Sequence, residues 1–506
     1  NKLKLLVYHA NKIDLTIGEY DDPKRQKQGY VSLPLLDVGN VYIAGTSGSG
    51  KNTLFSTMIY STIINHNSDE VNIYIIDLGS EKLTKFHKAP QVGDVLTIEN
   101  KDQIKYLFYM LEDIKNERQK YYANNGGDFA SDVKNKNCKF PNILVFIYDM
   151  EVFKETFEDI FDDSFVPFTR NCSKFGIFFI TCSTSVSSLG FLAENNFPTK
   201  IGLNLVDSSD YSMFFNTNLI PSKNPGRGLI EIDDEVYEFQ APLIFEDDPS
   251  DQKLNYVFEQ LDKFLANKAP AVPTVLDVVD ENYIKDLSIS LDKIPIGINL
   301  LTAQTSYYDF TNRFNLVLSA KSNDGLVFVS SLIKIIEKLS DKKIIVVNSI
   351  KDAELEFSEN VKYYDSGFKK IIPVINNNVL KYNDMDESEN DFVIVILGYN
   401  KVSKAMEKAK DEDDSVVSLE EMIANAKNNK FFKFIFYDTA SLFDEVATED
   451  ISNYVDSANG IWVGRGFENQ SFFEAMDTYN DNVTLNTDSV VLLKDGKAEY
   501  AKFIKM

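Results

Sequence analysis

The sequence predicts an α/β protein of two tandem P-loop domains, each a mostly parallel sheet with helices on both faces. Short apolar runs such as "NILVFIY" (142–148) alternate with amphipathic segments, the pattern of parallel strands covered by helices. One apolar run leads into a glycine-rich turn and then a helix, beginning "AGTSGSGKNTLF" (44–55). The whole arrangement recurs in the second half of the chain.

Length and composition describe a globular protein with several cores. At 506 residues the chain exceeds one domain of about 100 to 200 residues. Its apolar runs are shorter than the roughly 20 residues of a membrane-spanning helix, so we expect none. The chain begins with Asn1 rather than Met and has no signal-peptide pattern. We therefore expect a piece of a longer protein, with any membrane anchor outside it.

The net charge, the histidines and the cysteines limit the classes of function that the chain can have. The net charge is -25, from 77 acidic against 52 basic residues, and such a field repels nucleic acid. We therefore do not expect nucleic acid as a partner. The three histidines have no spacing for a metal pair, so no zinc site is predicted. Cys138, Cys172 and Cys182 form no disulfide framework, which indicates a reducing compartment.

The repeat sets the domain boundaries. We predict domains at 1–262 and 278–506, joined by a linker at 263–277 whose Ala/Pro-rich centre breaks the preceding helical period. "LTIGEY" (15–20) corresponds to "IPIGIN" (294–299), and Asn40 aligns with Asn315. The later matched strands are 71–80 with 342–351, 142–151 with 391–400, and 175–184 with 431–440.

The first glycine-rich turn matches a phosphate-binding loop. Gly45, Gly50 and Lys51 have the required spacing, and the turn lies between a strand and a helix. Backbone N–H groups and the helix N-terminus would bind phosphate, and Lys51 would neutralise the β and γ oxygens. A plain Gly/Ser-rich turn is the alternative. The predicted ATP site comprises Gly45, Thr46, Ser47, Gly48, Ser49, Gly50, Lys51, Asn52 and Thr53.

Asn52 departs from the loop pattern. A Ser or Thr normally follows the lysine and holds Mg²⁺ through its hydroxyl. Asn52 offers an amide oxygen instead, and the hydroxyl of Thr53 points about 100° around the helix. We predict that Asn52 and Asp149, at the end of the strand 142–148, hold Mg²⁺. Alternatively, Asn52 is a tolerated change and its metal contact runs through water.

The catalytic base is less well defined. Met150 occupies the position of the usual carboxylate, and Glu151 follows it, either as the base or as a solvated acid at a helix start. Lys51, Asp149 and Glu151 are therefore the predicted catalytic residues of a weak ATPase. The hydroxyls of Thr181, Ser183 and Thr184 are candidates either to sense the γ-phosphate or to cap the following segment. Arg170 and Arg227 are candidates either for an arginine finger that reaches a neighbouring subunit's nucleotide or for surface ion pairs.

The second half lacks this chemistry. Ala320 aligns with Gly45, Gly325 with Gly50, Leu326 with Lys51, and Gly398 with Asp149. Without the lysine and the acid, the usual route to binding Mg²⁺-ATP is lost. We predict that this domain is a non-hydrolytic binding or regulatory module.

An ordered set of motifs resembles a known family over essentially the whole chain. In the first half, "IGEYDDPKRQ", "GTSGSGKNTL", "ILVFIYDMEVFKE", "NFPTKIGLNL" and "PGRGLI" are similar to the FtsK/SpoIIIE-like ATPases. In the second half, "IPIGIN" and "GIWVGRGF" are similar to the last, degenerate ATPase domain of the same kind of protein. More closely, they resemble the tandem cytosolic ATPase domains of the membrane-bound motor of type VII secretion. Gly45, Gly50, Lys51 and Asp149 match the family's motifs, whereas Asn52 and Met150 depart from its more active members.

The resemblance implies RecA-like domains that assemble as a hexamer, anchored at the cytoplasmic face of the bacterial membrane through segments absent here. It implies secreted partners of the WXG-type helical-hairpin class, and ATP with Mg²⁺ as ligands. Lys200 stands where DNA-pumping relatives often have Arg. Two alternatives are an FtsK-like DNA translocase, which the net charge opposes, and a scaffold that nucleotide only locks in shape.

Overall fold

The protein consists of two compact units, Asn1–Pro273 and Thr274–Met506, in this computed structural model. The boundary lies within the segment 263–277 proposed as the linker. Residues 23–26 of the "IGEYDDPKRQ" motif lie outside the described residues. The structure describes residues 12–22, 27–232, 235–245, 250–339, 341–351, 355–383, 385, 391–445, 454–476 and 483–506.

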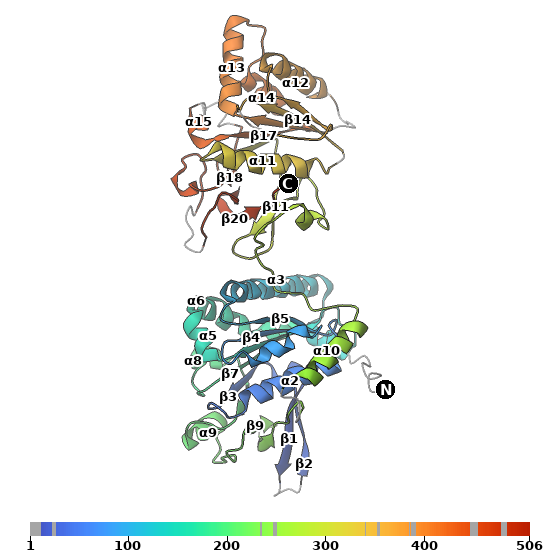
Figure 1. The fold of residues 1–506 in the computed structure, drawn as a ribbon, viewed down its shortest axis with the longest axis vertical. Helices are drawn as coiled ribbons and strands as arrows, with labels where there is room; N and C mark the ends of the chain where they lie inside the picture. Colours follow the sequence, from blue (N-terminus) through green and yellow to red (C-terminus); the bar gives the residue numbers. More distant parts are fainter. Residues whose placement is uncertain are drawn as a thin grey trace. The chain divides into compact units, whose positions relative to one another are not determined.

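The first unit contains a ten-stranded sheet in the order β2-β1-β10-β9-β8-β3-β7-β6-β4-β5 (Figure 1). The run from β8 to β5 is parallel, and β9, β10, β1 and β2 extend it antiparallel. The strands are β1 (Asp14–Asp22), β2 (Lys27–Pro34), β3 (Val41–Ala44), β4 (Val71–Asp77), β5 (Val92–Leu96), β6 (Asn142–Tyr148), β7 (Ile177–Ser183), β8 (Thr199–Gly202), β9 (Arg227–Ile232) and β10 (Glu235–Gln240).

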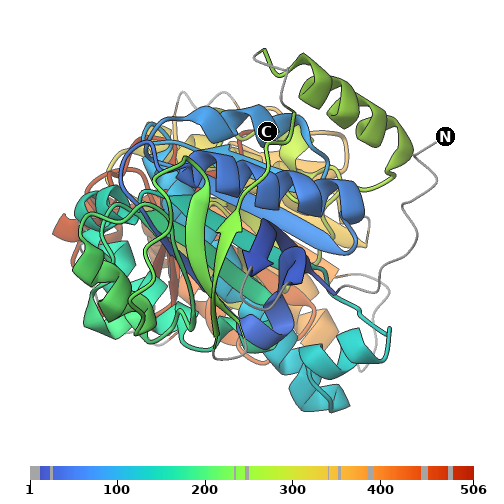
Figure 2. The same ribbon diagram turned by 90° about the horizontal axis from the view of Figure 1, so that it is seen from below.

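Helices cover both faces of this sheet. Apolar side chains of α2, η2 and α10 form one core, and those of α3, α5 and α9 form the other. In Figure 2, α2 lies across the strands of the unit. The elements are α1 (Leu35–Val38), α2 (Lys51–Asn65), η2 (Lys82–Lys88), α3 (Lys101–Asn125), α4 (Phe129–Lys134), α5 (Met150–Thr156), α6 (Glu158–Ile160), η3 (Phe161–Phe165), α7 (Val166–Thr169), η4 (Cys172–Phe175), α8 (Gly190–Glu194), α9 (Ser208–Phe215) and α10 (Gln252–Phe264).

The second unit repeats the topology strand for strand, in the order β12-β11-β20-β19-β18-β13-β17-β16-β14-β15. The prediction of two tandem, mostly parallel P-loop domains is confirmed. The strands are β11 (Ile294–Asn299), β12 (Thr305–Tyr308), β13 (Phe314–Ser319), β14 (Lys342–Asn348), β15 (Val361–Tyr364), β16 (Asp391–Leu397), β17 (Phe432–Thr439), β18 (Gly460–Val463), β19 (Ser489–Lys494) and β20 (Lys497–Phe503).

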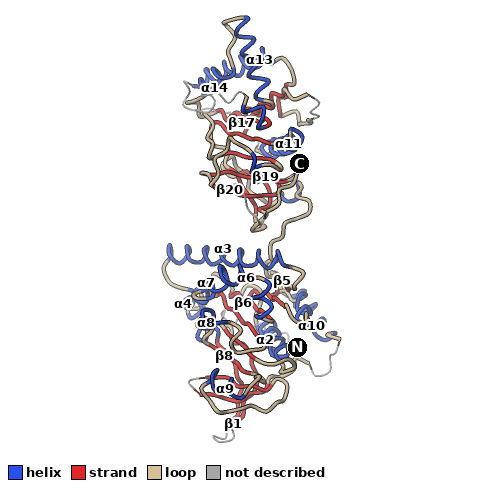
Figure 3. Tube along the Cα trace, turned by 90° about the vertical axis from the view of Figure 1, so that its left-hand side faces the viewer, coloured by secondary structure: helices blue, strands red, loops and turns tan. Residues whose placement is uncertain are grey.

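Helices also flank the second sheet, as the tube in Figure 3 shows. Helix α11 packs on β13 and β17, while α12, α13 and α14 form a core with alternate side chains of the same strands, such as Phe434 and Phe436. The elements are η5 (Glu281–Ile284), α11 (Ser322–Ile336), α12 (Phe368–Asn383), α13 (Tyr399–Glu412), α14 (Leu419–Ala426), α15 (Ala440–Asp444) and η6 (Phe467–Asn469). Within the described residues, no helix combines the length and the apolar character needed to cross a membrane.

A matched pair of glycines explains why "IG" recurs in both halves. A Cβ atom on Gly18 would lie 2.1 Å from the carbonyl oxygen of Gln240, and one on Gly297 would lie 2.0 Å from that of Lys502. Each glycine lies beside a register shift in its edge hairpin. Only glycine permits this close approach of two backbones, so the same residue is required twice.

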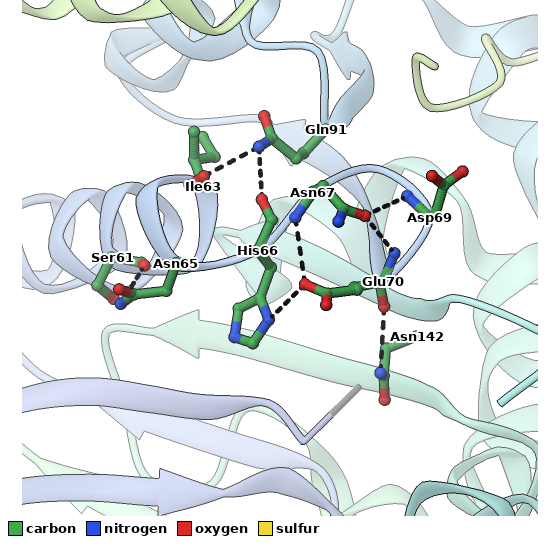
Figure 4. Close-up of polar contacts among 9 residues, drawn as sticks. All are labelled: Ser61, Ile63, Asn65, His66, Asn67, Asp69, Glu70, Gln91 and Asn142. Carbon is green, nitrogen blue, oxygen red and sulfur yellow. Dashed lines mark hydrogen bonds and ion pairs between the residues drawn. The ribbon is translucent and has the colours of Figure 1, made fainter. Parts of the chain in front are cut away.

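The end of α2 distant from the glycine-rich loop is fixed by buried polar contacts (Figure 4). The carboxylate of Glu70 lies 3.2 Å from His66 Nδ1 and accepts a hydrogen bond from the backbone N–H of Asn67. The Gln91 amide donates to the carbonyl oxygens of Ile63 and His66. These contacts hold the helix end against the starts of β4 and β5.

The Ala/Pro-rich segment packs along the sheet edge of the first unit. The hydroxyl of Tyr74 donates to the carbonyl oxygen of Pro270, and the backbone N–H of Val272 donates to Asp94. Ala269 and Val272 are buried. Residues up to Val272 are therefore part of the first unit's packing.

A buried arginine ties α3 to the strands beneath it. The Arg118 guanidinium donates to the carbonyl oxygens of Phe175 and Pro141, at 2.5 and 2.8 Å, and lies over the rings of Phe129 and Phe140. Burial lowers the pKa of Arg118 to about 10, so it remains charged at neutral pH.

Replacing this arginine destabilises the first unit. Arg118→Ala leaves two buried carbonyl groups without this donor and removes a large packed side chain, which costs about 3 kcal/mol of unfolding free energy. The chain's single tryptophan, Trp462, reports on the second unit, so denaturation followed by far-UV circular dichroism shifts while the Trp462 fluorescence transition does not. Lys120→Ala, an exposed position of the same helix, is the matched control; equal effects of the two variants would contradict the prediction.

Candidate nucleotide-binding site

The glycine-rich loop is a six-residue connection, 45–50, between β3 and α2. Gly48 and Gly50 have positive φ angles of 76° and 102°, which favour glycine. A Cβ atom on Gly50 would lie 2.3 Å from the backbone nitrogen of Gly226, whose N–H donates to the carbonyl oxygen of Ser49. Gly50 is therefore required both for its backbone angle and for this close contact.

Two neighbouring segments hold the first half of the loop. The backbone N–H of Gly45 donates to the carbonyl oxygen of Ser183, at the end of β7. The backbone N–H and hydroxyl of Thr46 both donate to the carbonyl oxygen of Asn204, after β8, at 2.8 and 2.9 Å. These hydrogen bonds fix the path of the first half of the loop.

Lys51 lies inside the curve of this loop. Its side chain is buried, and its ammonium group donates to the carbonyl oxygens of Gly45 and Thr46. Lys51 is also the first residue of the 15-residue helix α2, whose N-terminus carries partial positive charge. Ammonium, helix terminus and curved backbone together form an electropositive concavity that suits a phosphate chain.

Asp149 and Asn52 lie at the same edge of the sheet as the loop. Asp149 follows β6 with a φ of 75°, and its Oδ1 caps α5 by accepting a hydrogen bond from the N–H of Val152 at 3.2 Å. The Asn52 Nδ2 donates to the hydroxyl of Ser80 at 3.1 Å. A carboxylate accepts several hydrogen bonds, so the cap leaves Asp149 with acceptor capacity. Amide and carboxylate oxygens are the ligands that Mg²⁺ takes, so this donor set fits the ion.

Glu151 has a structural contact that the sequence did not indicate. Its Oε1 accepts hydrogen bonds from the backbone N–H of Ser185, at 3.3 Å, and from the hydroxyl of Ser188. Nearby, the Tyr42 hydroxyl donates to the carbonyl oxygen of Ser185. Glu151 and Tyr42 therefore anchor the segment that follows β7.

The hydroxyls and arginines considered as sensors differ in their surroundings. Thr181 is fully buried and donates to the carbonyl oxygen of Ile147, and the Ser183 hydroxyl donates to that of Ser185. Thr184 is exposed. Arg227 pairs with Glu238 at 2.8 Å, and Arg170 is exposed. The structure therefore brings neither Thr181 nor Ser183 to the loop as an uncommitted hydroxyl.

Two cavities adjoin the start of α2. A small one, of about 130 Å³, is lined by Asn52, Thr53 and Ser56 on one side and by Leu243, Phe245 and Leu254 on the other. A wider, open one of about 680 Å³ is lined by Asn52 and by the lysines of η2, namely Lys82, Lys85 and Lys88. Sequence reasoning missed these walls because they come from distant segments.

The equivalent position in the second unit has no such loop. Only residues 320–321 separate β13 from α11. The Tyr437 hydroxyl is 2.9 Å from the Ser319 hydroxyl and donates to the carbonyl oxygen of Ser322, closing the turn. Burial raises the pKa of Tyr437 to about 12, so it stays protonated.

The alignment of Gly325 with the loop glycine Gly50 is wrong in structural terms. Gly325 lies within the first turn of α11, and a Cβ atom there would lie 2.2 Å from the Tyr437 hydroxyl. The glycine makes room for a tyrosine, not for a phosphate. Gly398 replaces the acid, with a φ of 77° ahead of α13.

These features define the class of the first unit. A glycine-rich loop with a buried lysine, between a central parallel strand and the following helix, is the arrangement of a P-loop NTPase. Residues 20–266 match the FtsK/SpoIIIE family model. This part of the chain is an FtsK/SpoIIIE domain, as the motifs predicted.

Individual relatives agree with this assignment. The chain is 22% identical over 437 residues to the type VII secretion system protein EssC of Staphylococcus aureus, covering 78% of this chain but 29% of that protein. Its fold is similar to that of ATPases 2 and 3 of EssC from Geobacillus thermodenitrificans (TM-score 0.74, 21% identity, 98% and 97% of the two chains).

A second structure with a similar fold is Thermomonospora curvata EccC, ATPases 2 and 3, in complex with a signal sequence peptide. Its TM-score is 0.59 at 17% identity, covering 98% of this chain and 93% of that one. The predicted resemblance to the tandem ATPase domains of type VII secretion is thereby confirmed.

Two glycines of the loop allow a test of its geometry. We expect Gly48→Ala to cost about 1 kcal/mol, because Gly48 has a positive φ but no atom near an added Cβ. Gly50→Ala also forces Gly226 to move, so we expect an additional loss of about 2 kcal/mol or more. Thermal unfolding of the first unit measures both, and equal costs would show that the Gly50–Gly226 contact is unimportant.

Proposed function

We propose that this chain is the cytosolic ATP-binding and substrate-recognition module of a type VII protein secretion motor. The first unit binds ATP and hydrolyses it weakly or conditionally, and the second unit binds no nucleotide and serves substrate docking or assembly. The observation that carries this proposal is a contrast within one repeated fold. The first unit has a loop that encloses Lys51, whereas the second has a two-residue turn closed by Tyr437.

In the first unit, the triphosphate occupies the concavity of Gly45, Thr46, Ser47, Gly48, Ser49, Gly50 and Lys51. Lys51 exchanges its carbonyl partners for phosphate oxygens, which bear a full negative charge. Asn52 and Asp149 hold Mg²⁺, which neutralises charge on the phosphates when bound. The adenine ring of ATP extends past Thr53 to the small cavity between α2 and the apolar side chains of Leu243 and Phe245.

The residues after Asp149 support weak rather than rapid hydrolysis, because neither of them is free to orient a water molecule. Hydrolysis requires a carboxylate or amide that orients the attacking water. Met150 is apolar and buried, and the Oε1 of Glu151 is bound to Ser185 and Ser188. As the base, Glu151 has to leave these contacts, so turnover is coupled to movement of the segment 183–188.

The similarity to type VII secretion proteins supports the partners that we propose. We assign docking of secreted WXG-type helical-hairpin proteins to the second unit, and self-association to a hexamer to the full-length protein at the cytoplasmic face of the membrane. A cavity of about 530 Å³ in the second unit combines apolar walls, Ile345 and Phe392, with Lys343 and Lys362. Such a cavity suits an acidic segment with apolar side chains. The match to this chain spans 29% of the length of the EssC relative.

The first test is a titration with ATP, with and without Mg²⁺. We expect Lys51→Ala to raise the Kd for ATP by at least about tenfold, because a charge-assisted contact is worth roughly 1.5 to 3 kcal/mol. We expect Asn52→Thr to strengthen the Mg²⁺ dependence of binding and to increase phosphate release. Unchanged affinity in Lys51→Ala would refute the proposed site. Hydrolysis stimulated by duplex DNA at physiological salt would instead favour a DNA translocase.

Nucleotide should stabilise one unit only. At 100 times Kd a ligand adds about 2.7 kcal/mol to the folded state it binds, or about 5 to 10 °C in Tm for a unit of this size. We expect Mg²⁺-ATP to raise the unfolding transition of the first unit, followed by circular dichroism, and to leave the Trp462 fluorescence transition unchanged. If Mg²⁺-ATP raised the Tm of the Trp462 fluorescence transition in the Lys51→Ala variant as well, a nucleotide would bind to the second unit.

A further inference from the structure

Ser80 lies in a turn that the buried end of β4 holds rigidly. Asp77 is fully buried, and its carboxylate accepts hydrogen bonds from the backbone N–H groups of Gly79, at 3.3 Å, and Leu83, at 3.0 Å. The turn therefore has a fixed path out of the sheet, although Gly79 and Ser80 themselves are exposed.

This turn runs between the two residues assigned to Mg²⁺. On one side, the Ser80 hydroxyl accepts a hydrogen bond from Asn52 Nδ2 at 3.1 Å. On the other side, a Cβ atom on Gly79 would lie 2.8 Å from the ring of Tyr148 and 3.9 Å from the Cβ of Asp149. Residues 79 and 80 thus connect Asn52 to Asp149 across the carboxyl edge of the sheet.

The contact with Ser80 determines which atom Asn52 presents. An amide has one oxygen that can bind a cation and one NH₂ group that cannot. Because the NH₂ group is bound to Ser80, the oxygen points away from Ser80 and is available for a ligand. A side chain that is held in this way binds a metal more tightly than a freely rotating one.

We propose that Ser80 is a positioning residue for Mg²⁺, which orients the amide oxygen of Asn52 in place of the missing loop hydroxyl. Two residues from separate elements then perform the task that a single Ser or Thr performs in the usual loop. The inference rests on the proposed function, since it requires nucleotide and Mg²⁺ at this loop.

The test measures metal affinity directly. Mn²⁺ replaces Mg²⁺, and its binding to the full chain saturated with a non-hydrolysable ATP analogue is followed by electron paramagnetic resonance. We expect Ser80→Ala to weaken Mn²⁺ binding by about tenfold while the affinity for the analogue without metal is unchanged. Ser80→Thr retains the hydroxyl and should restore binding. Ser212→Ala, an exposed hydroxyl on α9, is the matched control.

A double substitution separates positioning from a general structural effect. In the Asn52→Thr background the hydroxyl is restored at position 52, so Ser80→Ala should have no further effect on Mn²⁺ affinity. Equal losses in both backgrounds, no loss in either, or tighter Mn²⁺ binding in Ser80→Ala would overturn the inference. If the analogue binds in a Lys51-dependent manner but Ser80 has no effect, only this inference fails. If the analogue does not bind at all, the proposed function fails with it.

Discussion

The phosphate loop of the first unit depends on the backbone contact between Gly50 and Gly226. A six-residue connection that curves around a lysine has to turn sharply before the helix, and the turn presses Gly50 against the segment before β9. A Cβ atom on Gly50 would lie 2.3 Å from the backbone nitrogen of Gly226, and Gly226 has a φ of 79°, which favours glycine. The antiparallel part of the sheet, which has no role in phosphate chemistry itself, therefore supports the loop through Gly226 and Ser49.

The two units show how one fold carries two different connections between the same strand and the same helix. The strand order is the same in both, and so is the close backbone approach at Gly18 and Gly297. Where the first unit has six residues between strand and helix, the second has two, and the tyrosine of β17 fills the space above them. A shorter connection cannot surround a phosphate, because too few N–H groups remain to face it. The second unit has retained the fold without this site.

Two candidate site residues of the first unit, Asn52 and Glu151, each bind a segment that follows a strand of the sheet. Asn52 is bound to the turn after β4, and Glu151 is bound to the segment after β7. Asn52 and Glu151, which would act on the nucleotide or its metal, therefore each also hold a neighbouring segment. ATP binding at this loop would therefore act on the positions of two segments before any chemistry takes place. This is the behaviour expected of a module whose main work is conformational.

The sequence by itself determined the repeat, the alternation of buried strands with helices and the positions of Gly45, Gly50, Lys51 and Asp149, since spacing and periodicity are local properties of the chain. It also indicated the family, because the ordered motifs span the whole chain. Tertiary structure alone decided the rest. Asn204, Gly226 and Ser80 reach the loop and the start of α2 from segments 28 to 177 residues away from their partners, a proximity that no local pattern encodes. The role of Gly325 likewise depended on Tyr437, over a hundred residues away, because only side-chain packing determines whether a glycine makes room for a ligand or for a neighbour.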